Sequence, residues 1–149
     1  MSGRLVDTNV WVAAVFPIHP GHAAAQSVLE QATPDSPAVF CRSTQISFLR
    51  LVSTQTLQVA YGAVGLTNRD AIAALTALLA LPGVLELPEA TKTRDTWLRL
   101  AAGGDASPKV WMDAYLAAFA VRAGLSLVTF DGGFRNFAAA GLEVELLQA

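Results

Sequence analysis

Residues 5–16 have the sequence Leu-Val-Asp-Thr-Asn-Val-Trp-Val-Ala-Ala-Val-Phe, in which a single acid separates two apolar segments. The first two residues predict a buried strand, and Asp7, Thr8 and Asn9 are residue types that commonly begin a helix. A carboxylate between apolar segments is costly to bury unless a partner compensates its charge. Asp7 is therefore either an ordinary helix cap or part of a charged site.

Two further acids occupy similar positions near the other end of the chain. Asp113 interrupts the apolar helical pattern of residues 110–120, and Asp131 ends the apolar run 125–130. Each acid alone has an ordinary interpretation, since Asp131 begins an Asp-Gly-Gly turn and Lys109 could pair with Asp113 across one helical turn. All three together predict a buried acidic cluster, which a divalent cation would neutralise.

Composition predicts one folded domain over residues 1–149, because 53% of the residues are hydrophobic and only 15% are charged. No apolar run reaches the roughly 18 residues that span a bilayer, and no signal-peptide core precedes Asp7, so we expect a cytoplasmic protein without a membrane partner. The single Cys41 fits a reducing compartment. A net charge of −2 provides no general attraction to nucleic acid, so a polyanionic substrate would be held locally.

The order of the predicted elements indicates an α/β fold. Apolar strands are predicted at residues 5–7, 38–41, 84–87, 126–130 and 142–147. Beyond the helix that follows Asp7, helices are predicted at residues 22–31, 43–53, 68–81, 89–102, 108–122 and 132–139. Strands that alternate with helices predict a parallel sheet covered on both faces.

The predicted sheet brings the acids together. Sites in open parallel sheets form beyond the carboxyl ends of the strands, and Asp7 and Asp131 each follow a strand directly. Asp113 lies on the apolar face of its helix, which should face the sheet. Gln45 lies on the apolar face of the helix 43–53, near its start, and is placed to join the same cluster.

Four segments in order carry a family resemblance: residues 5–11, 41–51, 113–120 and 127–131. They resemble PIN-domain ribonucleases, and more narrowly the VapC-type toxins of bacterial and archaeal toxin–antitoxin pairs. The resemblance implies a three-layer α/β/α sandwich around a central parallel sheet of four to five strands. It also implies a divalent-metal-dependent endoribonuclease that cleaves an RNA phosphodiester, uses Mg²⁺ or Mn²⁺ and acts as the toxin of a type II pair.

The resemblance places the catalytic and metal-binding carboxylates on Asp7, Asp113 and Asp131. The second acid of the family falls on Gln45, and a further acid falls on Gly133, so this chain departs from the family pattern twice. Some polar residues are expected to orient the carboxylates or contact the substrate: Thr8, Asn9, Gln45 and Thr129. Basic residues are candidates for phosphate contacts: Arg42, Arg50, Lys109 and Arg135.

Two other functions are compatible with parts of this pattern. A haloacid-dehalogenase-type phosphatase also begins with an Asp after a strand, but Asn9 stands where that chemistry uses a second Asp. A non-catalytic or weakly active PIN-like RNA-binding scaffold would accommodate Gln45 and Gly133. The resemblance further implies a homodimer, an RNA substrate and a cognate small antitoxin. Apolar faces of helices 23–29 and 43–53 would supply such contacts, or else belong to the core.

Overall fold

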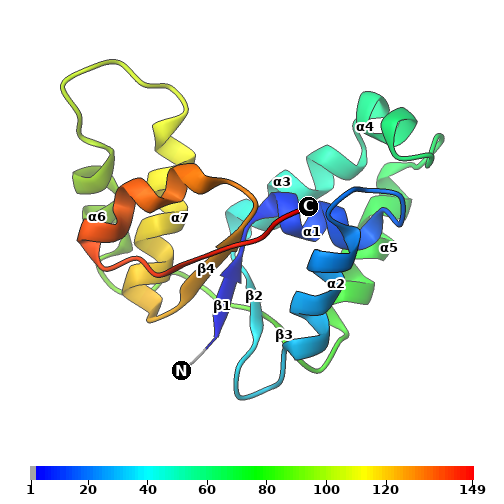
Figure 1. Cartoon of the computed structure of the whole chain (residues 1–149), viewed down its shortest axis with the longest axis horizontal. Coiled ribbons are helices and arrows are strands. Elements are labelled where there is room, and N and C mark those ends of the chain that lie inside the picture. The colour runs from blue at the N-terminus through cyan, green and yellow to red at the C-terminus, as the bar shows by residue number, and fades with distance from the viewer. Residues whose placement is uncertain (1–2) are drawn as a thin grey trace.

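The computed structural model describes residues 3–149, and a parallel sheet of five strands lies at its centre (Figure 1). The strands are β1 (Arg4–Val6), β2 (Ala38–Phe40), β3 (Val84–Glu86), β4 (Ser126–Thr129) and β5 (Val144–Leu146). Their order in the sheet is β3-β2-β1-β4-β5, with every neighbouring pair parallel. The predicted parallel sheet of four to five strands is confirmed.

Helices cover both faces of this sheet. They are α1 (Thr8–Val15), α2 (His22–Gln31), α3 (Arg42–Val52), α4 (Gln55–Ala60), α5 (Asn68–Leu79), α6 (Thr93–Ala101), α7 (Val110–Ala123) and the 3₁₀ helix η1 (Gly132–Ala140). Successive strand residues point to opposite faces. Val6 therefore belongs to the core that includes residues of α1, α2, α3 and α5. Leu5 belongs to the core that includes residues of α7 and η1, with α6 packed against it. The three-layer α/β/α sandwich is confirmed.

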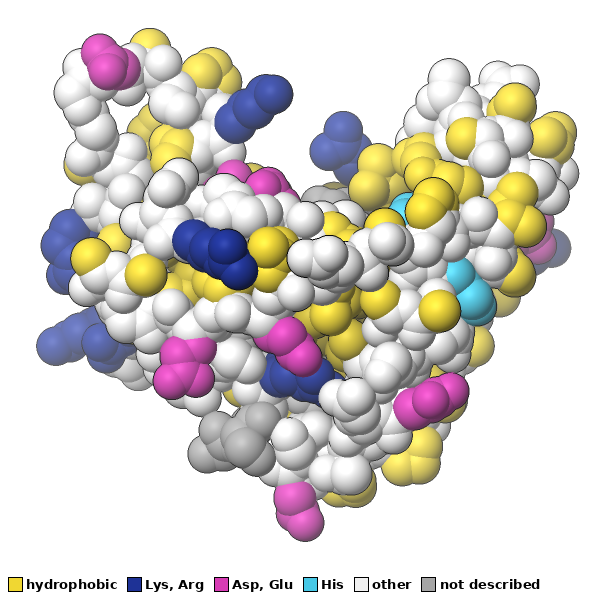
Figure 2. Space-filling view, in the orientation of Figure 1, with side chains coloured by type: hydrophobic (Ala, Val, Ile, Leu, Met, Phe, Trp, Pro, Cys, Tyr) yellow, Lys and Arg dark blue, Asp and Glu magenta, His cyan; other side chains and the backbone are white. Residues whose placement is uncertain are grey.

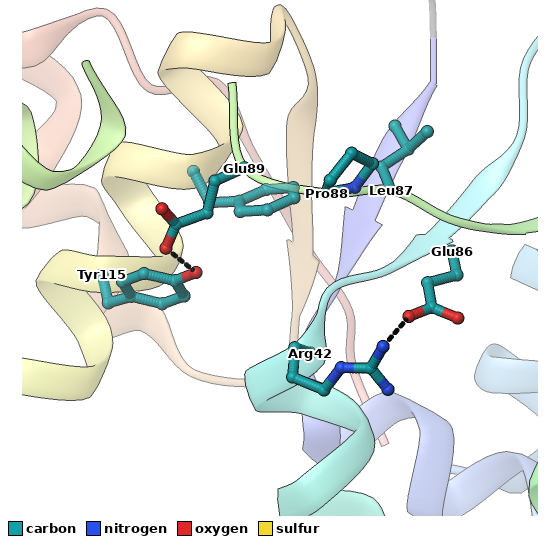
Figure 3. Close-up of a pocket in the computed structure, with 7 residues that line it drawn as sticks. Arg42, Glu86, Leu87, Pro88, Glu89 and Tyr115 are labelled. Carbon is teal, nitrogen blue, oxygen red and sulfur yellow. Dashed lines mark hydrogen bonds and ion pairs between the residues drawn. The ribbon is translucent and has the colours of Figure 1, made fainter. Parts of the chain in front are cut away.

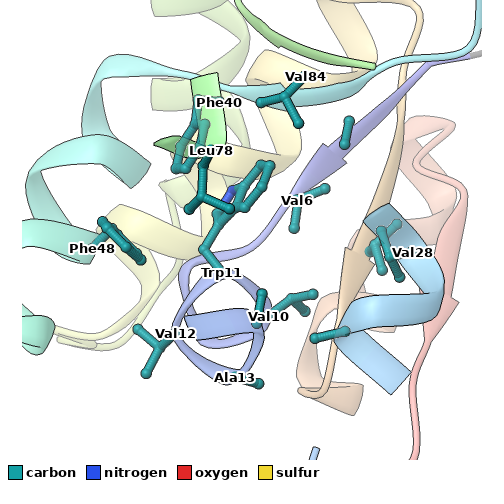
Figure 4. Packing of buried hydrophobic residues seen from close by; sticks show 14 of the residues in the cluster. Val6, Val10, Trp11, Val12, Ala13, Val28, Phe40, Phe48, Leu78 and Val84 are labelled. Atoms are coloured by element: carbon teal, nitrogen blue, oxygen red, sulfur yellow. The ribbon is translucent and has the colours of Figure 1, made fainter. Parts of the chain in front are cut away.

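Trp11 is the largest side chain at the interface between the sheet and α1 (Figure 4). It is fully buried and stacks on Phe40 of β2, with ring centroids 3.7 Å apart and an interplanar angle of 8°. Phe48 of α3 meets the Phe40 ring edge-on, with ring centroids 6.1 Å apart. These aromatic contacts hold both α1 and α3 against β2.

Some boundaries differ from the sequence prediction. The helix predicted from residue 89 begins at Thr93, because Lys92 has φ +68°, a left-handed conformation that a right-handed helix cannot include. The short helix α4 was not predicted. It is held by the buried Gln58, whose amide donates to the carbonyls of Val52 and Leu66, each at 2.9 Å. No helix within residues 3–149 has the length and apolar character needed to span a membrane.

The two helical layers separate above the carboxyl ends of the strands. Helices α1 to α5 form one lobe, and α6, α7 and η1 form the other (Figure 1). The space-filling view shows a notch between the lobes, with acidic side chains at its base and basic side chains on both flanks (Figure 2). The carboxyl edge of the sheet therefore opens into a concave surface, as expected for a parallel α/β fold.

Candidate active site

Asp7 joins the end of β1 to the start of α1. Its backbone N–H donates to the carbonyl of Val128 in β4, at 2.9 Å. One carboxylate oxygen accepts the backbone N–H of Thr8, and the other accepts the hydroxyl of Thr129, both at 2.7 Å. The interpretation of Asp7 as a helix cap is thus correct. Capping does not exclude a charged site, because an ionised carboxylate retains further lone pairs.

Thr129 connects the ends of β1 and β4. Its hydroxyl donates to Asp7 and accepts the backbone N–H of Asp131, at 2.9 Å. The side-chain oxygen of Asn9 lies 3.5 Å from the backbone nitrogen of Phe130, a long hydrogen bond that ties the same two segments. Thr129 and Asn9 therefore hold the two acidic strand ends in register, whereas Thr8 contributes through its backbone.

Asp131 begins η1, as its turn-like sequence predicted. Its carboxylate accepts the backbone N–H of Gly133 at 2.8 Å. A Cβ atom at position 133 would lie only 3.1 Å from that carboxylate oxygen. A longer acidic residue at this position would therefore require Asp131 to shift.

Two of the three acids, Asp7 and Asp113, have raised pKa values. Burial raises the pKa of Asp7, against the hydrogen bonds from Thr129 and Thr8, and the charge of Asp131 raises it further. Burial also raises the pKa of Asp113, and the charges of Asp131 and Asp7 add to that effect. Like charges raise a carboxyl pKa only at short range. Asp113 therefore lies within electrostatic range of the two acidic strand ends.

This acidic group has no cationic partner in the described part of the chain. Residues 3–149 contain two ion pairs, Arg4–Glu145 and Arg42–Glu86, and neither includes the three acids. The pairing of Lys109 with Asp113 is therefore absent. Carboxylate oxygens suit Mg²⁺ or Mn²⁺, and Mg²⁺ is usually bound through one or two carboxylates, with water and substrate completing its shell. In the same residues, no group of three or more His, Cys, Asp and Glu side chains is arranged to hold a metal ion.

Gln45 lies at the start of α3, beyond the carboxyl end of β2, and its side chain is 4% exposed. Its carbonyl oxygen accepts a hydrogen bond from Arg42 at 3.2 Å. Arg42 also forms an ion pair with Glu86 at 2.6 Å (Figure 3). The Gln45 amide nitrogen has no hydrogen-bond partner among residues 3–149. A buried donor of this kind is costly unless a ligand or water satisfies it.

The other predicted basic residues differ in whether the element that carries them also carries one of the acids. Arg50 is exposed two turns further along α3, beside a pocket that α5 completes, so it is separated from the start of that helix. Lys109 is exposed directly before α7, and Arg135 is exposed on η1. Lys109 and Arg135 therefore belong to the elements that carry Asp113 and Asp131.

Sequence reasoning missed a pocket of about 460 Å³ beside Arg42 (Figure 3). It is lined by Arg42, Glu86, Leu87, Pro88, Glu89, Tyr115 and Phe119. The hydroxyl of Tyr115 donates to Glu89 at 2.6 Å, and burial, together with this carboxylate, raises the pKa of Tyr115. The only signal in the sequence was the position of Tyr115, two residues after Asp113 on the same helix.

The raised pKa values predict that Asp113→Asn stabilises the metal-free protein near neutral pH. The native state binds more protons than the unfolded state between the ordinary Asp pKa of 3.8 and the raised native value. Wild-type stability therefore falls as the pH rises through that window, whereas the neutral Asn does not ionise. Thermal melts with chelator should show the variant melting higher at neutral pH, with the difference vanishing below pH 3.8.

Asp70→Asn is the matched control. Hydrogen bonds from Thr67 lower the pKa of Asp70, so this substitution should reduce stability at neutral pH. Equal melting temperatures of wild type and Asp113→Asn at every pH would contradict the electrostatic interpretation of Asp113.

Comparison with known proteins places these features in a family context. A family model described as the PIN domain matches residues 4–140. The chain is 43% identical over 146 residues to Ribonuclease VapC41 of Mycobacterium tuberculosis, an alignment that covers 96% of this chain and 97% of the relative.

Two solved structures share the fold. One is VapBC2 from Rickettsia felis bound to a DNA fragment from their promoter; its TM-score is 0.67 at 12% identity, over 98% of this chain and 99% of that chain. The other is Mycobacterium tuberculosis VapC20, a sarcin–ricin loop cleaving toxin. Its TM-score is 0.63 at 21% sequence identity, and the match covers 95% of this chain and 96% of that chain. At these identities the likeness is one of fold.

Proposed function

Because the chain belongs to the PIN domain family, we propose that it is a divalent-metal-dependent endoribonuclease and the toxin of a type II toxin–antitoxin pair. The observation that carries the proposal is the placement of Asp7 and Asp131 at the carboxyl edge of the sheet, together with Asp113, where burial and neighbouring negative charge raise the pKa values of Asp7 and Asp113. The 43% identity to a named ribonuclease over nearly the whole chain supports the same activity.

Asp7, Asp113 and Asp131 are the proposed catalytic and metal-binding residues. A divalent cation, Mg²⁺ or Mn²⁺, supplies polarisation of the scissile phosphate and a water of lowered pKa when it is bound. Thr129 fixes one oxygen of Asp7 and the backbone that leads to Asp131, so the two carboxylates keep their orientation without substrate. Such outer hydrogen bonds hold ligand carboxylates in a productive geometry.

Substrate phosphates require positive charge near the acids. Lys109 and Arg135 are exposed on the elements that carry Asp113 and Asp131, and they are the proposed phosphate contacts. Arg42 has a second role, because it also positions the Gln45 amide. Its exposed guanidinium retains donors for a phosphate oxygen beyond those used for Glu86 and Gln45.

The proposal includes partners and a compartment. A cognate small antitoxin and a second copy of the chain are the proposed protein partners, supported by the VapBC name of a structure with the same fold. The cytoplasm is the proposed location, supported by the unpaired, buried Cys41. One domain over residues 1–149 is proposed, since helices from both ends of the chain cover the same sheet.

Purified protein and single-stranded RNA test the activity directly. Cleavage should require added Mg²⁺ or Mn²⁺ and should stop when a chelator is added. In cells, expression should arrest growth, and co-expression of the neighbouring small gene product should relieve the arrest. RNA that stays intact with either metal would contradict the nuclease function and would favour the alternative of a non-catalytic RNA-binding scaffold. Gln45 and Gly133, which replace two family acids, are the residues that support this alternative.

Gln45→Glu tests whether the second family position faces the metal. A carboxylate there adds negative charge to the group of acids, so we expect calorimetry to show Mn²⁺ binding about tenfold tighter or more. Arg42→Ala serves as the paired variant, because it frees the position 45 side chain from its present partner. Unchanged Mn²⁺ affinity in Gln45→Glu, with and without Arg42→Ala, would show that Gln45 is a structural residue.

A further inference from the structure

A pocket of about 360 Å³ opens between the first turns of α3 and α7. It is lined by Ser43, Trp97, Pro108, Trp111, Met112 and Tyr115. Helix α3 covers one face of the sheet and α7 covers the other, so the pocket bridges the two helical layers. Tyr115 also lines the neighbouring pocket that contains Arg42. The pocket therefore lies between the lobe that contains α3 and the lobe that contains α6 and α7.

Two aromatic rings of this pocket, those of Trp97 and Tyr115, are held by internal hydrogen bonds. The indole N–H of Trp97 donates to the carbonyl oxygen of Trp111 at 2.8 Å. The rings of Trp97 and Tyr115 meet edge-on, 5.7 Å apart at 90°, and the Tyr115 hydroxyl donates to Glu89. Because the polar groups of Trp97 and Tyr115 already have partners, these residues contribute ring surface to the pocket. These two rings therefore keep their positions without a ligand.

Two lining residues expose much of their apolar surface. Trp111 is 52% exposed and Met112 is 47% exposed, and they directly precede Asp113 on α7. Exposing a Trp and a Met side by side is unfavourable in water, so such a pair commonly marks a binding surface. Here the pair adjoins the proposed catalytic acid within one turn of the same helix.

The surroundings of the pocket favour one class of ligand. Arg42, whose side chain is 71% exposed, directly precedes Ser43, and the exposed Lys109 lies between Pro108 and Trp111. Among residues 3–149, no acidic side chain lines the pocket. Flat aromatic surfaces flanked by cations are the arrangement with which proteins bind single-stranded nucleic acid, since bases stack on the rings and phosphates meet the cations.

We propose that this pocket receives an unstacked nucleobase of the RNA substrate, from a nucleotide near the scissile phosphate. The base stacks on Trp111, Met112 covers its edge, and the Ser43 hydroxyl is placed to hydrogen-bond with it. Arg42 and Lys109 contact the adjoining phosphates. This inference rests on the proposed ribonuclease function and adds to it a subsite that selects single-stranded RNA.

Binding of fluorescently labelled single-stranded RNA tests the subsite in a full-length Asp7→Asn background, where cleavage does not interfere. Trp111→Ala should weaken RNA affinity about tenfold or more, the usual effect of removing a stacking side chain. Trp111→Phe keeps an aromatic ring and should retain most of the affinity. Ile72→Ala, which removes an exposed apolar side chain from α5, is the matched control and should change nothing.

Abasic RNA identifies the occupant. In a series of RNAs, each nucleotide in turn is replaced by an abasic one. At one position, the replacement should weaken binding to the protein that retains Trp111, but should not weaken binding to Trp111→Ala. Equal RNA affinity of Trp111→Ala and its parent would overturn the proposal. The proposal would also be overturned if Trp111→Ala changed only the self-association of the protein, measured by sedimentation, because the pocket would then be a contact between copies of the chain. RNA cleavage by the wild type tests the ribonuclease function, whereas RNA binding tests the subsite, so the two proposals can fail independently.

Discussion

Asp7→Asn and Asp113→Asn should each lower the rate of metal-dependent RNA cleavage at least about a hundredfold. Both substitutions keep the shape of the side chain and remove its charge. Asn also remains a good cap for α1, so Asp7→Asn should fold normally. The expected loss therefore comes from the missing carboxylate, which can no longer bind the cation or balance its charge. Initial rates with an end-labelled single-stranded RNA measure the effect.

Asp35→Asn is the control for this experiment, because Asp35 is an exposed acid in the loop between α2 and β2. It should cleave at the wild-type rate. Metal-induced thermal stabilisation adds a second measurement, since a ligand that binds only the native state raises the melting temperature. Addition of Mn²⁺ should raise the melting temperature of wild type and Asp35→Asn, but not that of Asp7→Asn. Wild-type cleavage by either active-site variant would remove that acid from the mechanism.

Trp11→Ala should have the largest effect on folding. Truncation of a buried Trp typically costs about 3–5 kcal/mol, whereas a whole domain is stable by only about 5–15 kcal/mol. Trp11 stacks on Phe40 and belongs to the core that joins the sheet to α1. Urea unfolding monitored by circular dichroism should show a much lower midpoint or an already unfolded protein.

Trp11→Phe is the informative partner of that variant. The Trp11 indole N–H is buried and has no hydrogen-bond partner within residues 3–149, so Phe removes an unsatisfied donor while it keeps a ring against Phe40. The loss of the unsatisfied donor offsets part of the cost of the smaller ring. The free energy of unfolding should therefore fall far less than in Trp11→Ala. Equal destabilisation by Phe and Ala would show that the fit of the indole, and not the aromatic stack, is what matters.

Several features of the site were predictable because they depend on short segments. An apolar strand followed by Asp and a capping sequence predicted that Asp7 begins a helix, and the Asp-Gly-Gly turn predicted the same for Asp131. The carboxyl-edge rule for parallel sheets then brought these two acids together. Helical spacing predicted that Asp113 faces them, and its pKa is raised by burial and further by their charges.

Other features depend on neighbours that no local pattern specifies. Thr129 bonds to Asp7 across 122 residues of sequence, and Arg42 reaches Glu86 on β3. The start of α6 was predicted too early because the left-handed conformation of Lys92 has no sequence signal of the kind that glycine provides. The pocket around Trp111 combines side chains from α3, α6, α7 and the loop before α7.

The sequence by itself determined the α/β class, the parallel sheet and the three acids at its carboxyl edge. These follow from hydrophobic periodicity and helix capping, which act over a few residues. The tertiary structure alone decided the order of the strands, the hydrogen bonds that orient each carboxylate, the partner of Gln45 and the aromatic pocket beside Asp113. Those features depend on which distant segments pack together, and packing is set by the shapes and free energies of the whole core.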